Sequence, residues 1–231
     1  MPDYLVRHYW WAYLWRPSLW FFDHQGVINL ILFGQYKKLL AATENLFEKY
    51  GGESTLQLAC VYGRLTPVLL GKNAPDLMHI ADVSQAQLVK VRQKVADDKR
   101  LVAARMNAES LAYRDSTFSR LIVFFLLHEL PHEARRRTLS ECLRVIASGG
   151  VLLLTEYQTK PQKNLLVRFP VTRKILTWLE PFLADFWRED LPSLLSELAA
   201  PMGKQVELLT HQRLFADFYQ VCAFRITSQN G

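Results

Sequence analysis

Short apolar runs alternate with amphipathic segments along most of the chain. Leu56, Leu58 and Cys60 alternate with their neighbours as in a buried strand, and later apolar runs have the length of further strands. The pattern predicts strands at 77–83, 101–104, 121–125, 151–155, 206–210 and 219–226, and helices at 36–50, 65–70, 84–97 and 133–147, the last ended by Gly149-Gly150. This alternation is typical of an α/β fold with a seven-stranded, mostly parallel sheet.

Two regions do not follow this alternation. Residues 1–36 hold 11 of the chain's 28 aromatic residues and predict a helical cap ahead of a domain at 37–231. Such a cap can line a pocket for a flat apolar ring, lie at the headgroup level of a bilayer, or only pack on the domain edge. Residues 158–200 predict a helical insertion after the fifth strand. Its cationic, amphipathic first half indicates contact with an anionic membrane surface.

Composition and charge narrow the possible partners and the location of the protein. Half of the 231 residues are apolar. The net charge of +6 suits nucleic acid or an anionic membrane surface, or has no specific partner. No nucleic-acid recognition motif supports the first. The three cysteines form no CxxC pair, which indicates reduced, structural thiols. We expect neither a transmembrane helix nor a signal peptide, because charged residues interrupt every long apolar stretch.

The turn after the first strand resembles a cofactor-binding motif. The segment Thr-Leu-Gln-Leu-Ala-Cys-Val-Tyr-Gly at 55–63 is similar to the first motif of class I S-adenosylmethionine (SAM) methyltransferases, with Gln57 in place of the usual acid. The resemblance implies a Rossmann-like fold of that class, with the last strand antiparallel. It also implies SAM contacts from Gln57, Ala59, Cys60, Val61, Tyr62 and Gly63.

Further contacts are expected at the ends of the next strands, where open α/β sheets bind ligands. Asp82, followed by Val83, can accept both ribose hydroxyls; the alternative is that Asp82 only caps the next helix. The segment at 105–119 resembles the quinone C-methyltransferase branch of the superfamily. That resemblance assigns adenine contacts to Asn107 and Ala108, and a cofactor contact to Phe124.

Polar residues then collect beyond the fourth and fifth strands. His128, Glu129, His132 and Glu133 lie within six residues, and Glu156 and Tyr157 reach the same crevice. Imidazole and carboxylates suit Mn²⁺ or Mg²⁺, so we predict a metal site from His128, Glu129 and Glu156, with His8 and Asp23 as second choices. A supporting or helix-capping role for His128 is the alternative.

Four segments together resemble the rhodoquinone biosynthesis (RquA) family. They are Tyr-Trp-Trp-Ala-Tyr at 9–13 and the segments at 59–67, 124–129 and 179–182. The resemblance implies a bacterial enzyme, peripheral to the cytoplasmic face of the inner membrane. It would convert ubiquinone to rhodoquinone with SAM as nitrogen donor and Mn²⁺. We assign catalysis to His128, Glu129 and Tyr157, and quinone contacts to His8, Tyr9, Trp10, Trp11 and Tyr13.

The altered first motif suggests a reason for such chemistry. An amine that attacks a quinone must be neutral, and replacing the motif's acid with Gln57 removes a charge that would hold its proton. Val61 and Tyr62 also fill space that glycines leave open. Two alternatives remain at this stage: a SAM-dependent methyltransferase acting on a quinone or other lipid, and a non-catalytic SAM-fold binding protein.

Overall fold

The predicted strands form one seven-stranded sheet. Its order is β3-β2-β1-β4-β5-β7-β6, and only β7 runs antiparallel to its neighbours. The computed structural model describes residues 1–9, 16–74, 76–159 and 164–228. The strands are β1 (Thr55–Leu58), β2 (Met78–Asp82), β3 (Leu101–Arg105), β4 (Phe118–Phe124), β5 (Ile146–Tyr157), β6 (Lys204–Leu214) and β7 (Tyr219–Ser228).

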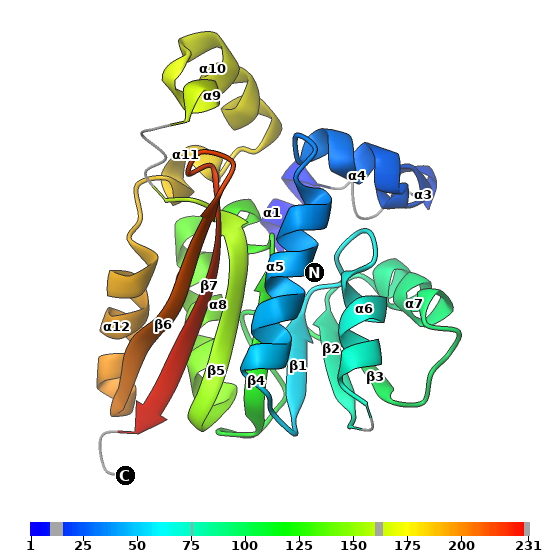
Figure 1. Ribbon diagram of the computed structural model, residues 1–231, viewed down its shortest axis with the longest axis vertical. Helices are drawn as coiled ribbons and strands as arrows, with labels where there is room; N and C mark the ends of the chain where they lie inside the picture. The colour runs from blue at the N-terminus through cyan, green and yellow to red at the C-terminus, as the bar shows by residue number, and fades with distance from the viewer. Residues whose placement is uncertain (10–15, 75, 160–163, 229–231) are drawn as a thin grey trace.

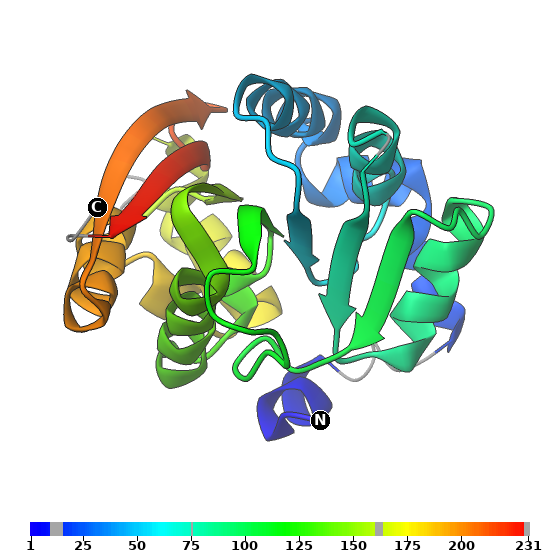
Figure 2. The same ribbon diagram turned by 90° about the horizontal axis from the view of Figure 1, so that it is seen from below.

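Helices cover both faces of this sheet (Figure 2). One face is covered by α5 (Tyr36–Lys49) and α6 (Leu65–Lys72), the other by α8 (His132–Val145) and α12 (Leu191–Ala199), while α7 (Gln85–Lys94) packs against β2 and β3. Because β1 and most of β4 and β5 are buried, their sequences read as apolar runs. Among the described residues, no helix combines the length and apolarity needed to cross a bilayer.

The prediction for Gly149-Gly150 was wrong. The helix ends earlier, at Val145, and both glycines lie inside β5, which begins five residues before the predicted start at 151. Pairing between β4 and β5 shifts register between Phe118 and Arg120, opposite the glycines. Gly149 takes a φ of +81° there. The glycines therefore permit an irregularity in the strand. Glycine allows the unusual backbone conformation of such an irregularity as readily as that of a helix end.

The cap and the first three helices of the insertion lie beyond the carboxyl ends of the parallel strands, whereas its last helix, α12, runs back beside β6 (Figure 1). The cap contains α1 (Asp3–His8), α3 (Arg16–Asp23) and α4 (Gln25–Ile31). The insertion contains α9 (Leu165–Arg168), α10 (Pro170–Leu179), α11 (Leu183–Phe186) and α12, and the short turns η1 (Leu127–Glu129) and η2 (Ala200–Met202) complete the fold. The two regions touch, because the Tyr9 hydroxyl donates to Glu180 Oε2 at 3.0 Å and the rings of Tyr4 and His8 pack edge-on against Phe182.

Candidate functional site

A cavity of about 470 Å³ lies between the strand ends, the cap and the insertion. Its volume falls in the range of about 300–1,000 Å³ that is usual for ligand pockets. It brings together most of the predicted site residues: Tyr9, Ala59, Cys60, Val61, Tyr62, Asp82, Val83, Asn107, Ala108, Phe124, His128, Glu129 and Tyr157. Four predicted residues, His8, Gln57, Gly63 and Glu156, do not line it. Trp10, Trp11 and Tyr13 lie outside the described residues.

Asp82, predicted to contact a ribose, lies at the carboxyl end of β2. Its side chain lines the cavity, where Oδ2 accepts the Cys60 N–H and Oδ1 accepts the Ser84 N–H, both at 2.6 Å. Burial raises the pKa of Asp82 to about 6, although these two amides oppose the shift. The Cys60 side chain also hydrogen-bonds to this carboxylate, which leaves the rest of its acceptor capacity for a ligand hydroxyl. The cap of α7 is Ser84, whose hydroxyl accepts the Gln87 N–H, so Asp82 does not itself cap that helix.

Asn107 and Ala108 line the cavity on the loop that follows β3. The Asn107 side-chain oxygen accepts the Glu109 N–H at 3.2 Å and retains a second lone pair. Glu109 also accepts a hydrogen bond from the Tyr4 hydroxyl of the cap at 3.1 Å and pairs with Arg137 of α8. The loop is thus tied to both the cap and the body of the domain.

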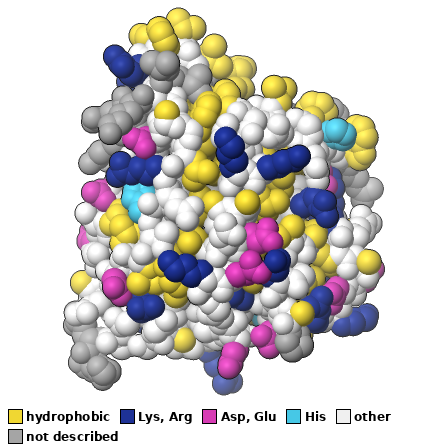
Figure 3. All heavy atoms as spheres, in the orientation of Figure 1, with side chains coloured by type: hydrophobic (Ala, Val, Ile, Leu, Met, Phe, Trp, Pro, Cys, Tyr) yellow, Lys and Arg dark blue, Asp and Glu magenta, His cyan; other side chains and the backbone are white. Residues whose placement is uncertain are grey.

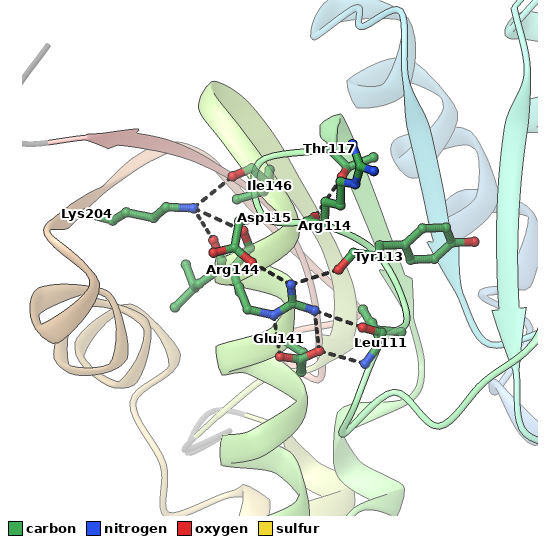
Figure 4. Close-up of polar contacts among 10 residues, drawn as sticks. Leu111, Tyr113, Arg114, Asp115, Thr117, Glu141, Arg144, Ile146 and Lys204 are labelled. Atoms are coloured by element: carbon green, nitrogen blue, oxygen red, sulfur yellow. Dashed lines mark hydrogen bonds and ion pairs between the residues drawn. The ribbon is translucent and has the colours of Figure 1, made fainter.

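A second set of contacts holds the far end of this loop (Figure 4). The Arg144 guanidinium donates to the Leu111 and Tyr113 carbonyls at 2.9 and 2.8 Å and to Asp115 at 2.7 Å. Glu141, one turn earlier on α8, accepts two further bonds from Arg144 and the Leu111 N–H. This arginine therefore fixes the loop that carries Asn107, a role that no local sequence pattern indicated.

The first turn keeps its shape through buried polar contacts. Gln57 is fully buried, donates to the Ala59 carbonyl at 2.9 Å and accepts the Thr66 hydroxyl at 3.1 Å. Its amide therefore braces the turn and does not face the cavity. Ala59 takes a φ of +64°, a conformation that favours glycine, while Val61 and Tyr62 line the cavity.

Gly63 ends the turn beneath the cap. Its N–H donates to Asp23 Oδ1 at 2.8 Å, and Lys94 of α7 donates to both the same carboxylate and the Gly63 carbonyl. Gly63 has a φ of +85°, and a methyl group added there would overlap the Tyr36 hydroxyl. Asp23 therefore links the cap to the turn and to α7, and it stands apart from the metal-ligand groupings of the described residues.

One cluster in the cavity can hold a metal ion. Ligand atoms of His128, Glu129 and Glu180 lie within 4.8 Å of one another, and all three residues line the cavity. Glu180 follows α10 and was missed by the sequence analysis. Its signal was a single acid inside the apolar segment Leu-Glu-Pro-Phe at 179–182.

Glu156 stands behind this cluster and does not belong to it. It is fully buried; its Oε1 accepts the Leu127 N–H at 2.6 Å and its Oε2 lies 2.8 Å from His128 Nδ1. Histidine ligands usually donate one ring N–H to such a carboxylate, which fixes the tautomer. The contact therefore leaves Nε2 of His128 as the nitrogen that can bind a cation.

The charges around His128 explain how a cation would fit. Burial by itself lowers the pKa of His128, but the carboxylates, Glu156 foremost, outweigh it and raise the pKa to about 9. Burial also raises the pKa of Glu180, while His128 and the Tyr9 hydroxyl oppose that shift. The imidazolium balances the acids when no metal is bound, and a divalent cation would replace its proton.

Aromatic rings form the wall beside His128. The Tyr157 ring lies 4.7 Å from the His128 ring and packs against Phe125 and Tyr219. Burial raises the pKa of the Tyr157 hydroxyl well above its usual range. This wall suits a flat apolar ligand more than a charged one.

A second acidic grouping, of His132, Asp185 and Glu189, has another function. The fully buried Arg135 contacts both acids, and donates to the Leu127 and Leu130 carbonyls at 2.9 and 2.8 Å. The Arg135 guanidinium therefore provides the positive charge that these two acids need. It also ties η1, which carries His128, to α11.

Comparison with known proteins finds a similar domain and similar folds. A family model described as a methyltransferase domain matches residues 55–150. The chain has the class I SAM-methyltransferase fold. An O-methyltransferase family protein from Burkholderia thailandensis superposes with a TM-score of 0.61 at 13% identity, covering 94% of this chain and 64% of that one. The N-methyltransferase NodS from Bradyrhizobium japonicum, solved with S-adenosyl-L-homocysteine, gives 0.51 at 13% identity, covering 83% and 85%.

Two relatives are similar in sequence. A demethylmenaquinone methyltransferase from Clavibacter sepedonicus is 28% identical over 133 residues, which cover 58% of this chain and 53% of the relative. An uncharacterised protein from Haemophilus influenzae is 23% identical over 139 residues, covering 59% and 55%. The chain thus spans about half the length of these relatives.

Proposed function

We propose that the protein is a SAM-utilising transferase that converts ubiquinone to rhodoquinone. In this reaction the SAM amine would add to the ring carbon that carries a methoxy group, methanol would leave, and the bond between that nitrogen and the methionyl α-carbon would then break, so that the nitrogen stays on the ring. The divalent metal would be Mn²⁺ or Mg²⁺. The observation that carries the proposal is the cluster of His128, Glu129 and Glu180, which faces the same cavity as Asp82 and Asn107. Metal ligands and a nucleoside site in one cavity suit a reaction that needs both.

The nucleoside end can hold SAM through residues on three strand ends. Asp82 would accept the ribose hydroxyls, and Asn107 would accept the adenine amino group. Gln57 turns its amide to the first turn and presents no charge to the methionyl end. Position 57 thus supplies no carboxylate to hold the proton of an amine there, which favours the neutral, nucleophilic form of that amine. Val61 and Tyr62 narrow the space in which the methionyl end would otherwise lie.

The quinone end is the aromatic wall next to the cluster. His128 offers an imidazole nitrogen, and Glu129 and Glu180 offer carboxylates, a donor set that suits Mn²⁺ and also Mg²⁺. A cation held there would act as a Lewis acid on a quinone carbonyl. Tyr157 and Tyr9 border the same space, and the buried Tyr157 keeps its proton, so it can donate a hydrogen bond to a ring oxygen.

The test is product analysis with labelled SAM. Purified protein is incubated with Mn²⁺, a short-tail ubiquinone and SAM carrying nitrogen-15 on its amine and carbon-13 on its methyl group. Mass spectrometry should find nitrogen-15 in a product that has lost a methoxy group. Unchanged quinone in the presence of all three components, with SAM bound, would contradict the proposal.

A second candidate is methylation of a quinone. It is favoured by the similarity to the demethylmenaquinone methyltransferase, which shares 28% identity over 133 residues. In that case carbon-13, not nitrogen-15, would enter the product of the same incubation. A non-catalytic binding protein would put neither label into the product. Calorimetry with SAM would then show whether the cavity binds the cofactor at all.

A further inference from the structure

Exposed apolar side chains gather at one end of the molecule, where the cap and the insertion lie (Figure 3). Figure 3 shows them over α10 and over α3 and α4. Leu30 and Trp178 are each 78% exposed, values that are unusual for large apolar side chains. We call this surface the rim; its described members are Trp20, Phe21, Leu30, Ile31, Phe169, Val171, Ile175, Trp178 and Leu179.

The rim continues into the cavity. Ile31 on the cap side is 45% exposed and Leu179 on the insertion side is 48% exposed, and both also line the cavity. An apolar path therefore leads from the outer surface to the space beside Glu180. A ligand with a long apolar tail can keep that tail on the rim while its head lies in the cavity.

Cations accompany the apolar residues on the insertion side. Arg168, Arg173 and Lys174 border a shallow groove next to the exposed face of α10. None of the three takes part in an ion pair with another described residue. Helices that lie on membranes combine apolar residues, tryptophan and unpaired basic residues in this way.

We propose that the rim docks on an anionic lipid bilayer, with the cavity mouth turned toward the acyl chains and the three cations on lipid phosphates. The docking rests on the geometry of the rim, and only the identity of the tailed ligand rests on the proposed function. A second copy of the chain is a poorer occupant. A two-fold contact through the rim would bring the unpaired cations of both copies to one interface.

The experiment is flotation of the full chain with phosphatidylglycerol-rich vesicles and with neutral phosphatidylcholine vesicles. We expect L30S/W178S to bind the anionic vesicles at least about tenfold more weakly, because each substitution removes a large apolar side chain from the bilayer. R173Q/K174Q should weaken binding about tenfold or more on anionic vesicles only. The control L77S/L208S changes two exposed leucines outside the rim, 53% and 43% exposed, and should bind like the wild type.

Several outcomes would overturn the docking. They are absence of vesicle binding by the wild type, wild-type binding by L30S/W178S, and an equal loss in the control. Self-association in lipid-free sedimentation that L30S/W178S abolishes would assign the rim to a second copy. Turnover of a short-tail quinone separates the two proposals, because Leu30 and Trp178 lie outside the cavity lining. In the wild type, amination without vesicle binding overturns the docking alone, and vesicle binding without amination overturns the proposed function alone.

Discussion

The substitution Glu156→Gln tests the candidate metal site formed by His128, Glu129 and Glu180. Glu156 is fully buried and accepts the Leu127 N–H at 2.6 Å while its other oxygen lies 2.8 Å from His128 Nδ1. Glutamine has nearly the same shape but offers one oxygen and one NH₂ group. If the oxygen keeps the Leu127 bond, the NH₂ group faces Nδ1, which must then accept. The ring proton moves to Nε2 and blocks the nitrogen that would bind the metal.

The size of the effect follows from this geometry. Loss of a carboxylate that orients a histidine ligand lowers metal affinity by about 10–100-fold. This corresponds to about 1.4–2.7 kcal/mol of binding free energy. SAM affinity should hardly change, because Asp82 and Asn107 make no hydrogen bond to Glu156. The substitution therefore separates metal binding from nucleoside binding.

The measurement is a Mn²⁺ titration followed by electron paramagnetic resonance or calorimetry at fixed pH. Glu180→Gln serves as a positive control, since it alters a residue of the cluster itself. Glu133→Gln removes a nearby exposed acid that lies outside the cluster, so it should leave the affinity unchanged. Wild-type Mn²⁺ affinity in Glu156→Gln, or an equal loss in Glu133→Gln, would refute the reasoning. Thermal melting of each variant confirms that it is folded.

Three further predictions concern the nucleoside end. In urea unfolding, Gly63→Ala should lower the free energy of unfolding by about 1–3 kcal/mol more than Gly149→Ala does. Both glycines have positive φ, but only at Gly63 would the added methyl group overlap another side chain. Equal losses of unfolding free energy in the two variants would contradict this. Arg144→Met should lower the free energy of unfolding by about 2 kcal/mol and weaken SAM binding, because it removes the bonds that hold the loop. The control Arg136→Met loses one exposed ion pair and should leave both stability and SAM binding unchanged. SAM affinity should fall as the pH is lowered through about 6, because protonation of Asp82 removes an acceptor for ribose hydroxyls; calorimetry of Asp82→Asn should show weak, pH-independent binding.

Much of the fold could be predicted because its signals are local. Most strands carry their own apolar run, and residues at the ends of parallel strands share one edge of the sheet, so Asp82 could be placed at that edge from the sequence. Asn107, which the resemblance assigned, lines the same cavity. The wrong prediction for Gly149-Gly150 shows what local sequence signals cannot decide. Glycines permit both a helix end and an irregular strand, and only the pairing of β5 with its neighbours decides between them.

The arrangement of the candidate metal site depended on tertiary structure. His128 and Glu156 are 28 positions apart, and Tyr9 and Glu180 are 171 apart, so no periodicity along the chain connects either pair. The sequence indicated acids and a histidine near one crevice. Which acid faces the cavity and which supports the histidine was set by the packing of the insertion and cap over the strand ends. The direction of a side chain depends on neighbours that only the folded chain brings together.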